Sequence, residues 1–108
     1  MNAVLWSPHS ESLLEDTVLG IAAKLYPDDG LRWEAKLRET ADELGRFPQS
    51  GDGVPIECFD TIPPNADDLR QTFCHPYRIV YEVVGNEVHI LSIRHSQMLV
   101  TDTDTFWN

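Results

Sequence analysis

The stretch YRIVYEVVGNEVHILSIRHS, Tyr77–Ser96, decides the fold of this chain. Two runs rich in Val, Ile and Tyr flank Gly85-Asn86, and a two-residue turn with glycine first is typical of a type II′ β-hairpin. In that register Glu82 lies opposite His89. The simplest interpretation of this pair is a cross-strand surface contact, worth well under about 1 kcal/mol.

The same register sorts the remaining polar residues of the hairpin by face. It places Arg78 opposite Ile93, so His95, two residues beyond Ile93, shares the face of Arg78. Arg94 is expected on the other face, near the strand end, where its charge reaches solvent. The Arg94 face is largely apolar, so we predict that it is the one covered by helices.

Two helices are predicted on the N-terminal side of the hairpin. The run AVLWS (Ala3–Ser7) is typical of a strand, and Ser7 followed by Pro8 favours a helix start. Pro27 ends the first helix, and Gly45 and Pro48 mark the end of the second. Apolar residues recur at helical spacing in each, at Leu14, Val18, Ile21 and Leu25, and at Trp33, Leu37, Ala41 and Leu44.

Residues 49–68 are rich in Gly, Pro and Asp and are predicted to form a long acidic loop before a strand at Leu69–Cys74. Residues 97–108 form a C-terminal tail. The element order β-α-α-β-β-β predicts a single α+β domain over residues 1–108, with an antiparallel helix pair on one face of a curved, mainly antiparallel sheet.

Charge limits the functions open to this chain. Eight Lys and Arg against 18 Asp and Glu give a formal net charge of −10, which disfavours strong direct binding to nucleic acid. No basic-then-apolar leader and no long apolar run is present, so we expect a cytoplasmic protein without a membrane span. Cys58 and Cys74 lack zinc-ligand spacing and are predicted to be reduced thiols. We expect no metal and no cofactor.

The ordered set WSP (6–8), ELGRFPQSGDGVP (43–55), a strand beginning with LR (69–70), YRIVYEV (77–83) and VHILSIRH (88–95) resembles the RelE/ParE superfamily of bacterial toxins from type II toxin–antitoxin systems. The resemblance runs from about Val4 to His95. It implies the same β-α-α-β-β-β fold and a growth-inhibiting toxin held inactive by a cognate antitoxin.

The resemblance leaves three functions open. The first choice is a ParE-like plasmid stabilization protein that binds a protein target such as DNA gyrase, because the net charge is acidic and the IRHS segment is similar to that branch. The second is a RelE-like, ribosome-dependent mRNA endonuclease, and the third is a non-toxic homologue that binds antitoxin or dimerises. In each case we expect a partner segment that brings Lys or Arg together with apolar anchors.

The resemblance also proposes roles for single residues. Under the nuclease interpretation, Arg78 of the YR motif stabilises phosphorane-like charge and His95 exchanges the proton. Under any interpretation, the polar residues predicted to contact the target or partner are Arg70, Glu82, His89 and Arg94. The simpler alternative is that the arginines only form salt bridges within an acidic protein.

Overall fold

A computed structural model describes all residues, 1–108. Its elements in chain order are β1 (Ala3–Trp6), α1 (Pro8–Lys24), α2 (Pro27–Arg46), β2 (Asp52–Gly53), β3 (Leu69–Cys74), β4 (Tyr77–Val84) and β5 (Glu87–His95), with short 3₁₀ turns at Ile56–Cys58, Ala66–Asp68 and Asp102–Asp104. The predicted α+β order is confirmed, with the two-residue β2 as an addition.

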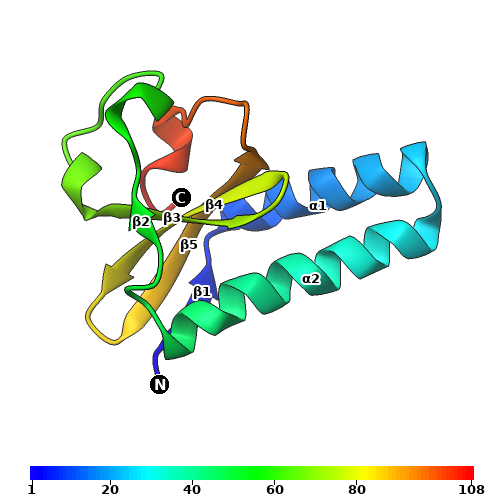
Figure 1. The fold of residues 1–108 in the computed structure, drawn as a ribbon, viewed down its shortest axis with the longest axis horizontal. Helices are drawn as coiled ribbons and strands as arrows, with labels where there is room; N and C mark the ends of the chain where they lie inside the picture. The colour runs from blue at the N-terminus through cyan, green and yellow to red at the C-terminus, as the bar shows by residue number, and fades with distance from the viewer.

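The sheet is mixed, with strand order β1-β5-β4-β3-β2. Strands β2 to β5 are antiparallel neighbours, whereas β1 is parallel to β5, with Val4 opposite Val88. The helical hairpin α1–α2 follows β1 and covers one face of the sheet, and its far end projects beyond the sheet (Figure 1). The loop of residues 49–68 and the C-terminal tail lie over the other face, so the sheet separates two layers.

The N-terminal end of α1 is fixed by local sequence and by contact with β5. Ser7 accepts a hydrogen bond from the backbone N–H of Ser10 at 3.0 Å, as predicted for an N-cap before proline. The Ser10 hydroxyl donates to the backbone carbonyl of Ile90 at 2.9 Å. The same carbonyl accepts from the N–H of Ser7 at 3.0 Å. The helix start is therefore joined directly to the central part of the sheet.

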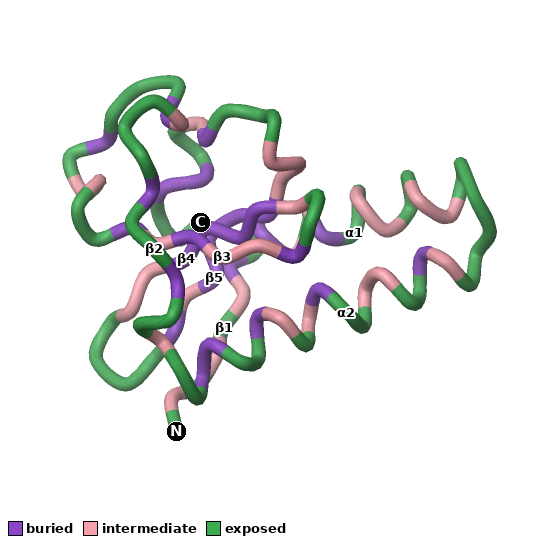
Figure 2. Tube along the Cα trace, in the orientation of Figure 1, coloured by how far each residue is buried: buried purple, intermediate pink, exposed green.

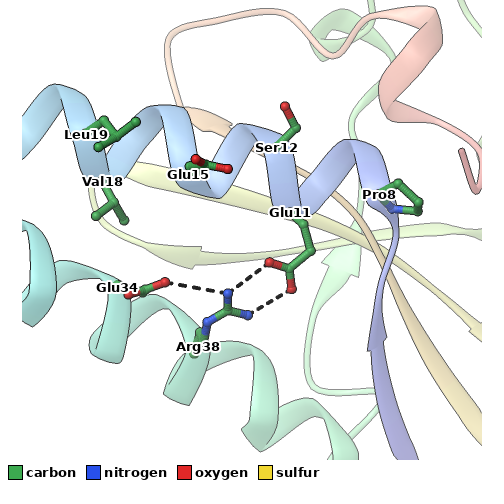
Figure 3. Close-up of a pocket in the computed structure, with 8 residues that line it drawn as sticks. All are labelled: Pro8, Glu11, Ser12, Glu15, Val18, Leu19, Glu34 and Arg38. Carbon is green, nitrogen blue, oxygen red and sulfur yellow. Dashed lines mark hydrogen bonds and ion pairs between the residues drawn. The ribbon is translucent and has the colours of Figure 1, made fainter.

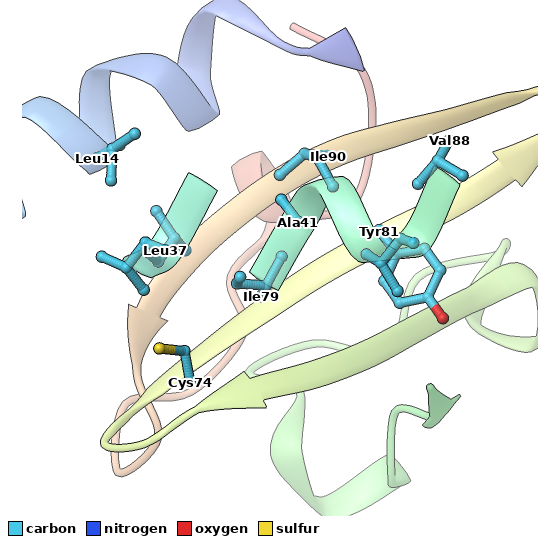
Figure 4. Close-up of a cluster of buried hydrophobic side chains, with 10 residues drawn as sticks. Leu14, Leu37, Ala41, Cys74, Ile79, Tyr81, Val88 and Ile90 are labelled. Carbon is cyan, nitrogen blue, oxygen red and sulfur yellow. The ribbon is translucent and has the colours of Figure 1, made fainter. Parts of the chain in front are cut away.

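Two hydrophobic clusters lie on the two faces of the sheet. The larger one fills the space beneath the helices (Figure 4), and its buried members are Leu14, Leu37, Ala41, Leu44, Cys74, Ile79, Tyr81, Val88, Ile90 and Ile93. The smaller one lies under the loop and tail and consists of Val54, Phe59, Leu69, Val80, Leu91 and Val100. The far end of the helical hairpin α1–α2 and much of the loop of residues 49–68 are exposed (Figure 2).

The turn of the β4–β5 hairpin is as predicted, but the register beyond it is not. Gly85 has a φ of +58° and Asn86 does not have positive φ, as a type II′ turn requires. Glu82 lies opposite His89 as expected. A β-bulge then leaves Leu91 as an extra residue, because Tyr81 pairs with Ile90 while Val80 pairs with Ser92.

Candidate functional site

The bulge reverses the predicted faces of the last residues of β5. Arg78 pairs with Arg94, not with Ile93, and Tyr77 pairs with His95. The expectation that Arg78 and His95 share a face is therefore wrong. The expectation that Arg94 lies on the other face of the sheet from Arg78 is wrong as well. One residue added to β5 after Ile90 shifts every later side chain to the other face of the sheet.

Arg78 is buried, with 7% of its surface exposed, in the layer under the loop and tail. Its Nε donates to Oε1 of Gln71 at 2.9 Å and its Nη1 to the backbone carbonyl of Met98 at 3.1 Å. Nη2 lies 3.6 Å from the sulfur of Cys58, and the guanidinium lies over the ring of Phe73. Arg78 thus joins β3, the loop and the tail, and its donors are occupied by the protein itself.

His95 lies on the helix side of the sheet, away from Arg78. Its ring meets that of Tyr77 edge-on, with centroids 6.2 Å apart, and its Nδ1 accepts from the N–H of Gln97 at 3.2 Å. A groove of about 300 Å³ between these two rings and the outer half of α1 is also lined by Gly20 and Met98. Burial raises the pKa of the Tyr77 hydroxyl, so that hydroxyl is a weak acid in this position.

Arg94 is held by a fully buried carboxylate of the tail. Its Nε donates to Asp104 at 2.7 Å, and Nε2 of His9 lies 2.8 Å from the other Asp104 oxygen. Burial alone would raise the pKa of Asp104, but the hydrogen bonds from Arg94, the N–H of Thr101 and His9 outweigh it and hold the pKa below its ordinary value. The two contacts of Asp104 thus anchor the tail on the start of α1 through His9 and on β5 through Arg94.

The other predicted contact residues lie at the β2–β3 edge and near the tail. Arg70 donates to the carbonyls of Gln49 and Gly51, so it too serves the loop. Glu82 lies opposite His89 in the sheet but does not bond to it. Nε2 of His89 contacts Glu87 on the same strand at 2.9 Å. The predicted cross-strand pairing of Glu82 with His89 is confirmed by the register, but no hydrogen bond joins their side chains.

Glu82 instead lines a shallow hollow of about 430 Å³ together with Asp67, Asp68 and Arg70. The ring of His89 has a second neighbour in the tail, the ring of Trp107, with centroids 4.9 Å apart. Of the four residues predicted to contact a partner, only Glu82 makes no side-chain hydrogen bond within the protein. The structure thus brings Arg78 and Arg94 together and leaves His95 apart.

Sequence reasoning missed a groove between the two helices, shown in Figure 3. It has a volume of about 420 Å³, and Arg38 of α2 reaches into it. Arg38 makes a two-pronged ion pair with Glu11 of α1, at 2.9 and 3.0 Å, and lies 3.6 Å from Glu34. The hydrogen bonds from Arg38 lower the pKa of Glu11. Of these contacts, only the Glu34–Arg38 pair could be predicted from sequence, since its members are four residues apart on one helix. The Glu11–Arg38 contact depends on how the two helices pack.

The structure does not bring together the two residues of the nuclease hypothesis, Arg78 and His95. RNA cleavage by attack of a 2′-hydroxyl requires a base, an acid and a cation close together. Arg78 and His95 lie on opposite faces, and the arginines of the sheet are occupied by the protein. No group of three or more His, Cys, Asp or Glu side chains could hold a metal ion, and both cysteines are free.

Comparison with known proteins agrees with this fold. The family model of the ParE toxin of type II toxin–antitoxin systems, parDE, matches residues 4–100. The chain therefore belongs to the ParE toxin family. No individual curated protein matches the sequence closely. No helix has the length and apolar content needed to cross a bilayer.

Two solved structures have a similar fold. One is the chromosomal ParDE toxin–antitoxin system from P. aeruginosa, with a TM-score of 0.69 and 20% identity over 88% of this chain and 96% of that chain. The other is the RelBE2 toxin–antitoxin complex from Mycobacterium tuberculosis, with a TM-score of 0.54 and 20% identity over 87% of this chain and 96% of that chain. The predicted membership of the RelE/ParE superfamily is confirmed.

Proposed function

We propose that this chain inhibits growth by binding a protein target, DNA gyrase, and that a cognate antitoxin neutralises it. The family match supports a ParE-like function, and both similar structures are of toxin–antitoxin systems. The observation that carries the choice of binding over RNA cleavage is the state of Arg78. Arg78 is 7% exposed as a residue, and a guanidinium hydrogen-bonded to Gln71 and Met98 is not available to a phosphate.

The charge of the chain supports the same choice. A nuclease working on ribosome-bound mRNA approaches a dense field of phosphates, and a net charge of −10 opposes that approach. A protein target carries no such field. We therefore propose that Arg78 stabilises the fold and that the surface that binds the target consists of solvent-exposed groups.

The experiment is expression of the chain alone and together with the product of the adjacent reading frame. Expression alone is expected to slow growth and to relax or entangle plasmid DNA, and co-expression is expected to restore both. In vitro, the purified chain is expected to inhibit supercoiling by gyrase. Rapid mRNA cleavage at ribosomes with normal supercoiling would favour the nuclease, and normal growth with soluble, folded chain would favour the non-toxic homologue.

A further inference from the structure

A hollow of about 510 Å³ lies between the loop of residues 49–68 and the C-terminal tail. Ile62 and Pro64 of the loop line one side, and Asp102 and Phe106 of the tail line the other. We call this feature the loop–tail hollow. It is separate from the helix groove of Figure 3 and from the groove beside His95.

The two walls of the loop–tail hollow are held in place by polar contacts. The side-chain amide of Asn65 donates to the carbonyl of Thr105 at 2.8 Å, which joins the loop to the tail. The fully buried Asp104 binds Arg94 and His9, which fixes the tail to β5 and α1. The hollow is thus preformed, and a ligand segment would not have to order it.

The hollow exposes apolar surface beside charge. Ile62 is 57% exposed and Phe106 is 51% exposed, and each lines the hollow. Large apolar side chains grouped around a concavity are typical of sites that accept an anchor residue of a partner. Asp102, on the same wall as Phe106, is exposed and has no ion pair.

The part of the chain that contains the hollow carries an excess of negative charge, although Asp102 is the only charged residue that lines the hollow itself. Residues 47–108 hold nine Asp and Glu, three Arg and no Lys. All three arginines are committed within the protein, Arg70 and Arg78 to loop and tail groups and Arg94 to Asp104. Since only Asp104 and Glu87 have an ion-pair partner, seven carboxylates remain without one. These are Asp52, Glu57, Asp60, Asp67, Asp68, Glu82 and Asp102.

We infer that the loop–tail hollow receives an extended segment of the cognate antitoxin that carries an apolar anchor flanked by Lys or Arg. The anchor packs on Ile62 and Phe106, and a cationic side chain pairs with Asp102. This inference rests on the proposed function, in which an antitoxin neutralises the chain.

The limits of the family match favour the antitoxin over the target as the occupant. The family model ends at residue 100, whereas Asp102 and Phe106 belong to the tail beyond it. One wall of the hollow therefore lies outside the residues that the family model matches. A feature of that kind suits the partner that is particular to one toxin, because specificity between pairs needs surfaces that differ.

The test is calorimetric titration of the purified chain with the purified product of the adjacent reading frame. Phe106→Ala and Asp102→Lys are each expected to weaken the affinity by at least about tenfold. The matched controls are Phe47→Ala, whose ring is 56% exposed, and Asp42→Lys, an exposed acid on α2. Both controls are expected to bind within about twofold of the wild type.

Salt and folding measurements complete the design. Wild-type affinity is expected to fall between about 0.05 and 0.5 M NaCl, and the slope is expected to be smaller for Asp102→Lys than for Asp42→Lys. Urea midpoints of all four variants check that the fold survives. Because the hollow residues face solvent, these midpoints are expected to lie close to the wild-type value.

Three results would overturn the inference. If Phe106→Ala and Asp102→Lys bind the product as tightly as wild type, the hollow is not the antitoxin site, and the proposed function stands. If they keep that affinity but no longer slow growth, the hollow belongs to the target. If wild-type chain does not bind the product, the inference fails, and unimpaired growth on expression would then remove the proposed function as well.

Discussion

At the scale of single residues, Arg78 shows how a motif residue can be structural. Its guanidinium lies in the layer between sheet, loop and tail without a carboxylate partner, and three protein groups accept its hydrogens. An arginine can substitute for several separate contacts because its donors point in fixed directions. The loop and the tail, far apart in sequence, are thereby held by one side chain of β4.

We predict that Arg78→Ala lowers the free energy of unfolding by about 3 kcal/mol, because it leaves buried acceptors of Gln71 and Met98 without a donor. Urea unfolding measures this loss. The control is Arg32→Ala, since the side chain of Arg32 is 70% exposed and only pairs with Asp29 on the surface. It is expected to change stability by less than about 0.5 kcal/mol. Wild-type stability in Arg78→Ala, together with lost toxicity, would instead indicate a functional arginine.

Asp104 predicts how stability depends on pH. Because its pKa is lowered in the folded protein, the carboxylate contributes stability above its unfolded pKa, and this contribution is lost as pH falls through the folded pKa. Asp104→Ala is expected to cost about 3 kcal/mol at neutral pH, since Arg94 loses its buried partner. The difference from wild type is expected to shrink steadily below about pH 4.

Urea unfolding at several pH values between about 7 and 2 checks the Asp104 prediction. Asp102→Ala is the control, because Asp102 lies in the same 3₁₀ turn but is exposed and has no ion pair. A constant difference between wild type and Asp104→Ala across this pH range would show that the loss comes from packing and not from charge.

At the scale of elements, local chemistry predicts where each element begins, but not where it pairs. Ser7 and Pro8 start α1, and Gly85 forms the turn, because each acts through its own backbone. The bulge at Leu91 leaves no such mark in the sequence, since Leu is equally suited to a regular strand. It arises where the Ile90 carbonyl bonds to the start of α1, a contact between residues 80 apart.

The candidate site was harder to predict than the fold for the same reason. Arg78, Arg94 and His95 were correctly placed on β4 and β5, but one extra residue in β5 exchanged the faces of Arg94 and His95. The Asp104 carboxylate that holds Arg94 comes from a tail whose docking depends on tertiary contacts. Alternation of apolar and polar residues predicts a strand, but only the pairing register determines which side chains share a face and can form a site.

Two helical glycines give a paired prediction at this scale. A Cβ at Gly45, in the last turn of α2, would come within 2.7 Å of the backbone oxygen of Asn2, whereas a Cβ at Gly20 in α1 meets nothing within 4 Å. Gly20→Ala is therefore expected to raise the free energy of unfolding by about 0.5–1 kcal/mol. Gly45→Ala is expected to lower it by about 1 kcal/mol or more, because the strand β1 must shift.

Thermal and urea unfolding of the two glycine variants measure both effects. They also control one another, since the amino-acid change and the helix propensity gained are the same. A gain in both variants would mean that the contact between the end of α2 and Asn2 can relax at little cost.

At the scale of the whole molecule, charge is divided unevenly between the two layers. Residues 8–46, the helical hairpin, hold five of the eight Lys and Arg and nine of the 18 Asp and Glu, and two of these cations, Arg32 and Arg38, form ion pairs. The loop and tail side has seven carboxylates without an ion pair. Like charges on a compact surface repel one another, so this side of the molecule is stabilised less than its packing alone would give.

We predict that Asp67→Lys stabilises the folded chain. Asp67 lines one hollow with Asp68, Glu82 and Arg70, so a cation at this position meets two carboxylates against one guanidinium. The free energy of unfolding is expected to rise by about 0.5 kcal/mol at low salt, and the gain is expected to vanish near about 1 M NaCl. Urea unfolding at both salt concentrations measures it. A gain that persists in high salt would indicate a cause other than charge.

The parallel pairing of β1 with β5 affects how the chain acquires its structure during synthesis. Trp6 lies opposite Ile90, so the first strand emerges from the ribosome 84 residues before its only neighbour in the sheet. At about 5–20 residues per second, that interval is roughly 4–17 s. During this time β1 and the inner face of the helical hairpin have no sheet to cover them. The last strand of the sheet to be made, β5, is thus the one that closes the core, and the nascent chain cannot complete its sheet before His95 has been added.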